Sequence, residues 1–179
     1  MKMKTIRIFA LAALILSLTS CVKSKLEVTY NNQESKIDSY IASKGEGYRS
    51  LRNGGANRLV LKEGEGEELR KDGFVSFYYA GYTFNGSFSQ SNLFVTNHQQ
   101  TAEQANWNLT DADYLIHEIN LADAKLIQGL KDGLEGVKAG EECEILFSGK
   151  YGFGDEDFGI IPANSALLYK IWVVGVAND

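Results

Sequence analysis

Residues 124–147, AKLIQGLKDGLEGVKAGEECEILF, decide the fold, because a helical pattern is followed directly by a strand pattern. Apolar side chains recur on one helical face over residues 124–138, and Asp123 is placed to cap the start of this predicted helix. Its three glycines each weaken a helix by roughly 1 kcal/mol at interior positions. We therefore expect the helix to pack against a sheet, to which the alternating residues 141–147 contribute a strand.

Apolar runs on both sides of this stretch predict further strands. Residues 59–61, 74–80 and 82–84 precede it, and the second run alternates its side chains between two faces. Residues 166–176 follow it and are apolar on both faces, which is typical of a central strand. The sequence thus predicts an α+β domain, an antiparallel twisted sheet of about five strands wrapped over one short helix.

The first twenty residues are typical of a secretion signal. A basic start precedes the mostly apolar residues 8–18, which are too few to cross a bilayer core as a helix. The next run, Leu18-Thr19-Ser20-Cys21, is similar to a bacterial lipobox, which implies cleavage before Cys21 and attachment of lipid to its thiol. The alternative is an ordinary secretory signal with an incidental cysteine. On both interpretations the mature chain leaves the cytoplasm.

Residues 21–57 are polar and mixed, and we interpret them as a tether that holds the following domain off the membrane. Within them, residues 35–43 carry Ile37, Tyr40 and Ile41 at helical spacing, and glycines then interrupt the pattern. A second interpretation stays open, in which this short helix packs onto the domain and belongs to it.

Composition argues against several classes of protein. The first twenty residues hold three basic side chains and no acidic one, so their removal takes the formal charge from −5 to −8 and disfavours a nucleic-acid partner. Two cysteines are too few for a disulfide-stapled scaffold, and if Cys21 carries lipid, Cys143 is left as a buried structural thiol. Neither the widely spaced His98 and His117 nor the acidic residues 155–157 form a metal-binding motif, so we expect no metal and no cofactor.

Six short blocks resemble the FKBP family of peptidyl-prolyl isomerases, in the family's order, between about residues 59 and 176. The blocks are Val75-Ser-Phe-Tyr-Tyr79-Ala-Gly81, Asn85-Gly86-Ser87-Phe88-Ser89, Leu126-Ile127-Gln128-Gly129-Leu130, Gly136-Val137-Lys138-Ala139-Gly140-Glu141, Tyr151-Gly-Phe153-Gly154 and Ile161-Pro162-Ala163-Asn164. The resemblance implies an FKBP-like fold for residues 58–179, with an insertion near residues 90–113 that is longer than the family's usual loop. It also implies isomerase activity on proline-containing polypeptides.

The resemblance further implies the residues of the site. A dry apolar pocket favours the twisted X-Pro amide, which is less polar than the planar one, so neither a nucleophile nor a metal is needed. The implied catalytic residues are Tyr79, Phe88, Ile127 and Phe153, and the implied substrate-binding residues are Ser89, Leu126, Leu130, Ile161 and Tyr169. The Ile127 N–H is expected to donate to a substrate carbonyl. The alternative for each of these residues is a place in the ordinary core.

Three positions depart from the family pattern. Ser89 stands where the family usually has Asp after the pocket Phe, Leu130 replaces a Trp floor, and Phe153 lacks the hydroxyl of the loop Tyr. Each lost orienting contact is worth about 1 kcal/mol as a neutral hydrogen bond. These losses predict a reduced rate and leave open a catalytically silent binding module.

The expected function is a prolyl isomerase that assists the folding of exported proteins. It would be lipid-anchored in the cell envelope, at the outer membrane, facing the periplasm or the cell surface. The insertion at residues 90–113 is suited to polypeptide contact, or it is a surface elaboration packed by Phe94 and Trp107. A third hypothesis, a surface lipoprotein that gathers nutrients, depends only on the lipobox and Trp107.

Overall fold

The structure is a computed structural model that describes residues 24–45, 47–123 and 125–178. The predicted signal and the predicted lipid site at Cys21 lie outside these residues. The chain divides into two compact units between Asn32 and Gln33, and the second unit contains the sheet. No helix in the described part of the chain combines the length and the apolar composition that a bilayer crossing requires.

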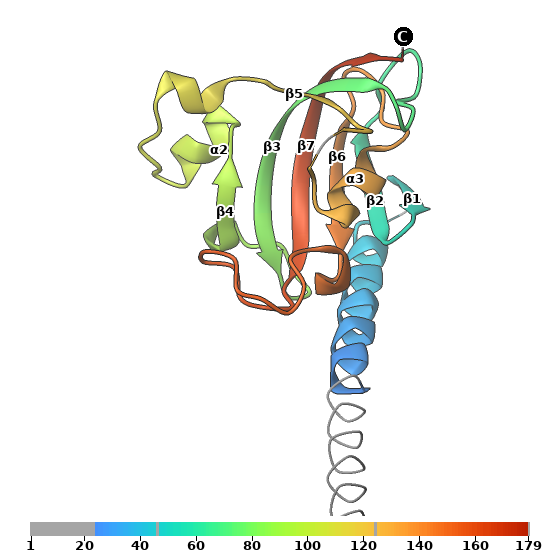
Figure 1. The fold of residues 1–179 in the computed structure, drawn as a ribbon, viewed down its shortest axis with the longest axis vertical. Coiled ribbons are helices and arrows are strands. Elements are labelled where there is room, and N and C mark those ends of the chain that lie inside the picture. Colours follow the sequence, from blue (N-terminus) through green and yellow to red (C-terminus); the bar gives the residue numbers. More distant parts are fainter. Residues whose placement is uncertain (1–23, 46, 124, 179) are drawn as a thin grey trace, which may run out of the picture. The chain divides into compact units, whose positions relative to one another are not determined.

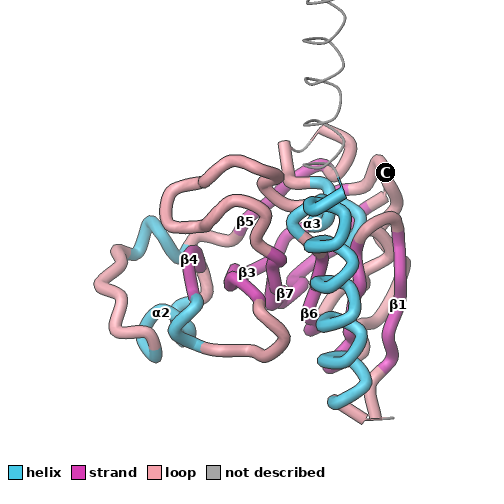
Figure 2. Tube along the Cα trace, turned by 90° about the horizontal axis from the view of Figure 1, so that it is seen from below, coloured by secondary structure: helices cyan, strands magenta, loops and turns pink. Residues whose placement is uncertain are grey.

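Seven antiparallel strands of the described chain form one sheet in the second unit (Figure 1). Their bounds are β1 Arg49–Asn53, β2 Ala56–Lys62, β3 Phe74–Phe84, β4 Leu93–Thr96, β5 His117–Asn120, β6 Glu142–Phe147 and β7 Ala166–Ala177. The order is β1-β2-β6-β7-β3-β4, with β5 paired to the first part of β3. Figure 2 shows β4, β3, β7 and β6 following one another across the sheet. The predicted antiparallel α+β fold is confirmed.

The sheet has more strands than the predicted five because three of them are short. β1, β4 and β5 contain four or five residues each, and β1 is largely exposed. Such strands carry too few alternating apolar side chains to stand out in a sequence. Two of them lie in segments that we interpreted as a tether and an insertion.

Side chains on the long strands alternate between two separate cores, as the period of a β-strand requires. On β3, Phe77 and Tyr79 belong to the first core, whereas Ala80 and Tyr82 belong to the second. The helix α3 (Gln128–Leu134) packs on the first core. The second core is covered by helical residues 33–43 and by the segment that follows the short helix α2 (Gln99–Gln104).

The helix α3 is shorter than predicted and lies unusually close to β6. The prediction of a helix over 124–138 capped by Asp123 is wrong, because the N-cap is Ile127 and the chain leaves the helix before Gly136, where φ is +80°. A Cβ on Gly129 would lie 2.2 Å from the Phe147 ring. The glycines that weaken the helix are therefore what allow it to approach the sheet.

A buried arginine holds the C-terminal end of α3. Arg58 Nη1 donates to the carbonyl oxygens of Gly133 at 3.1 Å and Glu135 at 2.7 Å, and its Nη2 donates to Gly136 at 3.0 Å. These bonds satisfy carbonyl groups that a helix terminus leaves without an intrahelical partner. The buried carboxylate of Glu141 lies 3.4 Å from Arg58 Nε and balances its charge.

Cys143 is free and buried in the first core, as expected for a structural thiol. Burial raises the pKa of this thiol well above its ordinary value. The neutral thiol behaves as a small apolar side chain in this core.

The helix at residues 33–43 belongs to the domain. Ile37 is fully buried in the second core, and the Tyr40 hydroxyl donates to Glu144 Oε2 at 2.8 Å across the sheet face. Burial, reinforced by the Glu144 carboxylate, raises the pKa of Tyr40, so the phenol remains a proton donor. The predicted domain boundary at residue 58 is therefore too late, because both this helix segment and β1 precede it.

The contact between α3 and β6 leads to a stability prediction for Gly129→Ala. Alanine favours a helix by roughly 1 kcal/mol over glycine, but overpacking against the Phe147 ring costs about 1–3 kcal/mol or more. We expect a net loss of about 2 kcal/mol in the free energy of unfolding, measured by urea denaturation. Gly47→Ala is the control, because a Cβ there meets nothing within 4 Å. Equal or greater stability of Gly129→Ala would contradict the close-approach account.

Candidate functional site

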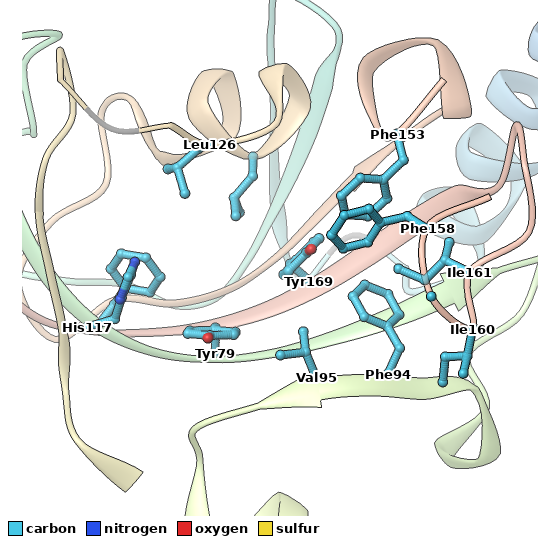
Figure 3. Close-up of a pocket in the computed structure, with 13 residues that line it drawn as sticks. Tyr79, Phe94, Val95, His117, Leu126, Phe153, Phe158, Ile160, Ile161 and Tyr169 are labelled. Atoms are coloured by element: carbon cyan, nitrogen blue, oxygen red, sulfur yellow. The ribbon is translucent and has the colours of Figure 1, made fainter. Parts of the chain in front are cut away.

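A cavity of about 380 Å³ opens on the first face of the sheet, between α3, β4, β5 and the turn that precedes β7. Its lining residues are Phe77, Tyr79, Phe94, Val95, His117, Leu126, Leu130, Phe153, Phe158, Gly159, Ile160, Ile161 and Tyr169. Figure 3 shows His117 at one end of this cavity and Phe158 and Ile160 at the other. Most of the exposed lining surface is apolar, so the cavity suits an apolar ligand.

The floor of the cavity is an aromatic cluster that a glycine makes possible. Tyr169 of β7 stacks on Phe147, with 6.0 Å between ring centroids, and meets Phe94 edge to face at 5.8 Å. A Cβ on Gly81 would lie 2.8 Å from Phe94 and 2.9 Å from Tyr169. The missing side chain at Gly81 therefore lets Phe94 cross β3 and reach the cavity.

Two phenols supply polar atoms to the cavity. Burial raises the pKa of both Tyr79 and Tyr169, and the proximity of the two rings raises that of Tyr169 further. Both hydroxyls are therefore neutral at physiological pH and can donate a hydrogen bond to a ligand carbonyl.

The rim of the cavity is apolar and exposed. Phe158 and Ile161 exchange two backbone hydrogen bonds of 2.9 Å, which close a tight turn through Gly159 at φ +60°. The Phe158 ring stacks on Phe153 at 4.4 Å between centroids, yet Phe158 is 60% exposed and Ile160 is 77% exposed. Contiguous exposed apolar side chains at a cavity mouth mark an interaction site.

The structure brings six of the nine predicted site residues together in this cavity. They are Tyr79, Leu126, Leu130, Phe153, Ile161 and Tyr169. Ile127 caps α3 next to the cavity and packs against the first core, but its side chain does not line the cavity. The role of its N–H toward a substrate stays a prediction.

The predicted placement of Phe88 and Ser89 in the pocket is wrong. The Phe88 ring packs on Tyr82, 4.9 Å between centroids, with Lys170 Nζ 3.9 Å from its centre, on the second face of the sheet. The Ser89 hydroxyl is exposed and lies 2.8 Å from that of Ser91. The reason is that a 3-10 turn, Gln90–Asn92, follows, and the chain re-enters the sheet only at β4.

Phe94 of β4 occupies the place that we predicted for Phe88. The following residue is Val95, so the position where the family usually has an acid carries an apolar side chain that lines the cavity. The apolar run Leu93-Phe94-Val95, made of aromatic and branched side chains, was the available signal, but it lay within the predicted insertion. Trp107, in contrast, packs against the second core and is part of the domain.

The cavity has a single imidazole, His117, in its described lining, and no set of ligands that would hold a metal. Its lining contains no serine, threonine, cysteine or lysine. Across the described residues, no three His, Cys, Asp or Glu side chains come together as a metal site would require. The arrangement can enclose an apolar segment, exclude water and offer a few hydrogen-bond donors.

Known proteins resemble this chain in both sequence and fold. "FK506-binding protein 1" of Aspergillus oryzae is 23% identical over 117 residues, which cover 65% of this chain and 94% of that protein. "FKBP-type peptidyl-prolyl cis-trans isomerase FkpA" of Buchnera aphidicola subsp. Acyrthosiphon pisum is 27% identical over 120 residues, 67% of this chain and 42% of the relative. The crystal structure of FkpA from Escherichia coli superposes with a TM-score of 0.56 at 19% identity, covering 99% of this chain and 74% of that one.

A model of one protein family also matches this chain, over one continuous span. Residues 65–174, more than half of the chain, match the model of the FKBP-type peptidyl-prolyl cis-trans isomerases. This span contains β3 to β6, α3, every residue that lines the cavity and most of β7. The chain therefore belongs to the FKBP-type peptidyl-prolyl cis-trans isomerase family.

Proposed function

We propose that this chain catalyses cis-trans isomerisation of X-Pro bonds in exported polypeptides. The observation that carries the proposal is the cavity between α3 and the sheet, which is built from aromatic and aliphatic side chains and contains two neutral phenols. Family membership supports the reaction class. The relative from Buchnera bears the name of the same activity.

The cavity would act by stabilising the twisted amide more than the planar one. Rotation about an X-Pro bond passes through a state without amide resonance, against a barrier of about 18–20 kcal/mol. This state is less polar than the planar amide, so transfer from water to a cavity lined by Leu126, Leu130 and Tyr169 lowers its relative free energy. The proline ring would lie over Tyr169, and Tyr79 would donate to a neighbouring carbonyl.

We further propose that the chain acts outside the cytoplasm, held to a membrane by lipid on Cys21. The support is the sequence of residues 1–21, in which the short apolar segment ends at Leu-Thr-Ser-Cys. Several acyl groups on one residue anchor a protein firmly, because each buried CH₂ contributes about 0.8 kcal/mol.

A second candidate function is a weakly active or silent module that holds unfolded chains. Val95 replaces an acid, Leu130 replaces a Trp floor, and Phe153 lacks a hydroxyl, so three orienting contacts of the family pattern are absent. The exposed side chains of Phe158 and Ile160 would still bind apolar segments.

The pair Phe94→Leu and Phe88→Leu tests the isomerase proposal and the placement of the site together. Both substitutions remove a phenyl ring, but only the first changes the cavity. In residues 22–179, we expect Phe94→Leu to lower kcat/KM on an X-Pro peptide about tenfold and Phe88→Leu to change it less than about twofold. A protease-coupled assay measures both values. Equal losses in two folded variants would contradict the assignment of the cavity.

Restoring two family contacts distinguishes the two candidate functions. If each contact is worth about 1 kcal/mol, Val95→Asp with Leu130→Trp raises kcat/KM by up to about thirtyfold over an already measurable native value. The weakly active or silent module requires a native chain with little or no acceleration. A high native activity that the double substitution leaves unchanged excludes that candidate.

The lipid anchor leads to a separate prediction for Cys21→Ser. In a Gram-negative host, we expect the native chain to partition with membranes and to gain the mass of acyl groups at Cys21. The Cys21→Ser chain should appear in the soluble periplasmic fraction without that mass. Intact-protein mass spectrometry gives the answer, and an unmodified native chain would contradict the anchor.

A further inference from the structure

One wall of the cavity contains an imidazole. His117 begins β5, pairs with Phe77 of β3 and is half-buried. Its ring meets Phe77 edge to face at 5.3 Å between centroids and meets Tyr79 at 5.8 Å, and Figure 3 shows it beside Tyr79 at one end of the cavity. The structure thus places a basic ring within an otherwise apolar lining.

The titratable groups that share the described cavity lining with His117 are two phenols. From β3 the titratable group is the Tyr79 phenol, and from β7 it is the Tyr169 phenol, and burial raises the pKa of both. The chain leading into α3 contributes Leu126 to the cavity, whereas the preceding Lys125 is exposed. On β5 itself the exposed Glu118 points to the opposite face of the strand.

Imidazole is the side chain that ordinarily changes charge between pH 5 and 8. Among the described residues that line the cavity, His117 is alone in carrying an imidazole. The neutral ring completes the aromatic wall. The protonated ring brings a positive charge that a bound apolar segment would cut off from water, which disfavours binding of that segment. A carboxylate on the ligand would offset this charge.

We propose that His117 determines which X-Pro segments this cavity prefers. At neutral pH the cavity prefers apolar segments, and at mildly acidic pH its preference moves toward segments with a carboxylate beside the proline. The inference rests on the proposed function, since it concerns the same site. The selectivity would come from the His117 ring at one end of the cavity, opposite the apolar rim formed by Phe158 and Ile160.

The test compares two peptides that differ only in the residue before proline, Leu or Glu. Residues 22–179 are assayed by NMR exchange at about pH 8 and about pH 5.5, where the glutamate remains largely ionised because its ordinary pKa is about 4.3. We expect the ratio of kcat/KM for the Glu peptide to that for the Leu peptide to rise at least about fivefold on acidification. The rise should vanish in His117→Phe and in His117→Gln.

The matched control is His98→Gln, which removes the other histidine of the chain. His98 stacks on Trp172 at 3.9 Å between centroids and does not line the cavity, so this variant should retain the native rise. A native ratio that does not change with pH would overturn the inference, as would the same rise in folded His117→Phe or His117→Gln.

The failure of the proposed function is distinguishable from the failure of this inference. If the chain accelerates neither peptide at any pH, the isomerase proposal is wrong. The Kd values of the two peptides are then measured by NMR shift titrations at the same two pH values. Binding of the Glu peptide relative to the Leu peptide should strengthen on acidification in the native chain and not in the His117 variants, and any other result overturns the inference.

Discussion

The close contact between α3 and β6 positions the candidate site. Gly129 lies against the Phe147 ring and Gly133 against Ile145, at separations that leave no space for a Cβ on either residue. Arg58 holds the other end of the helix through its last carbonyl groups. This close contact fixes the position of α3 and of the residues before it, and so the positions of Leu126 and Leu130 in the cavity wall.

The Phe147 ring supports both α3 and the floor of the cavity. Phe147 fills the space beneath Gly129 and also stacks on Tyr169. Gly81 has a comparable role on β3, where the missing side chain lets Phe94 meet Tyr169. Interiors are close-packed, so a methyl group added at either glycine would displace an aromatic ring of the site. The packing of the core and the shape of the cavity therefore depend on the same few contacts.

Long, regular elements could be predicted from the sequence, and the parts that depend on distant contacts could not. β3 and β7 contain 11 and 12 residues, and both were predicted, β3 from the alternating run 74–80 with 82–84 and β7 from a long run that is apolar on both faces. The motif pattern named Tyr79, Leu126 and Tyr169, which lie in one cavity, but it assigned Phe88 in place of Phe94 because residues 85–89 resembled a family block. His117 drew attention only as a poor metal ligand, since its place in the cavity follows from the pairing of β5 with β3. No local pattern reveals such a pairing.

The central claim is that an apolar cavity beneath α3 lowers the barrier to rotation about an X-Pro bond. The direct measurement is magnetisation exchange between the cis and trans proline signals of a Leu-Pro peptide, with residues 22–179 present at catalytic concentration. Uncatalysed exchange takes tens to hundreds of seconds at 25 °C. The account predicts exchange at least about tenfold faster, together with shifts of the Tyr79 and Tyr169 signals. Unchanged exchange in the presence of those shifts would contradict it, because the peptide would then occupy the cavity without catalysis.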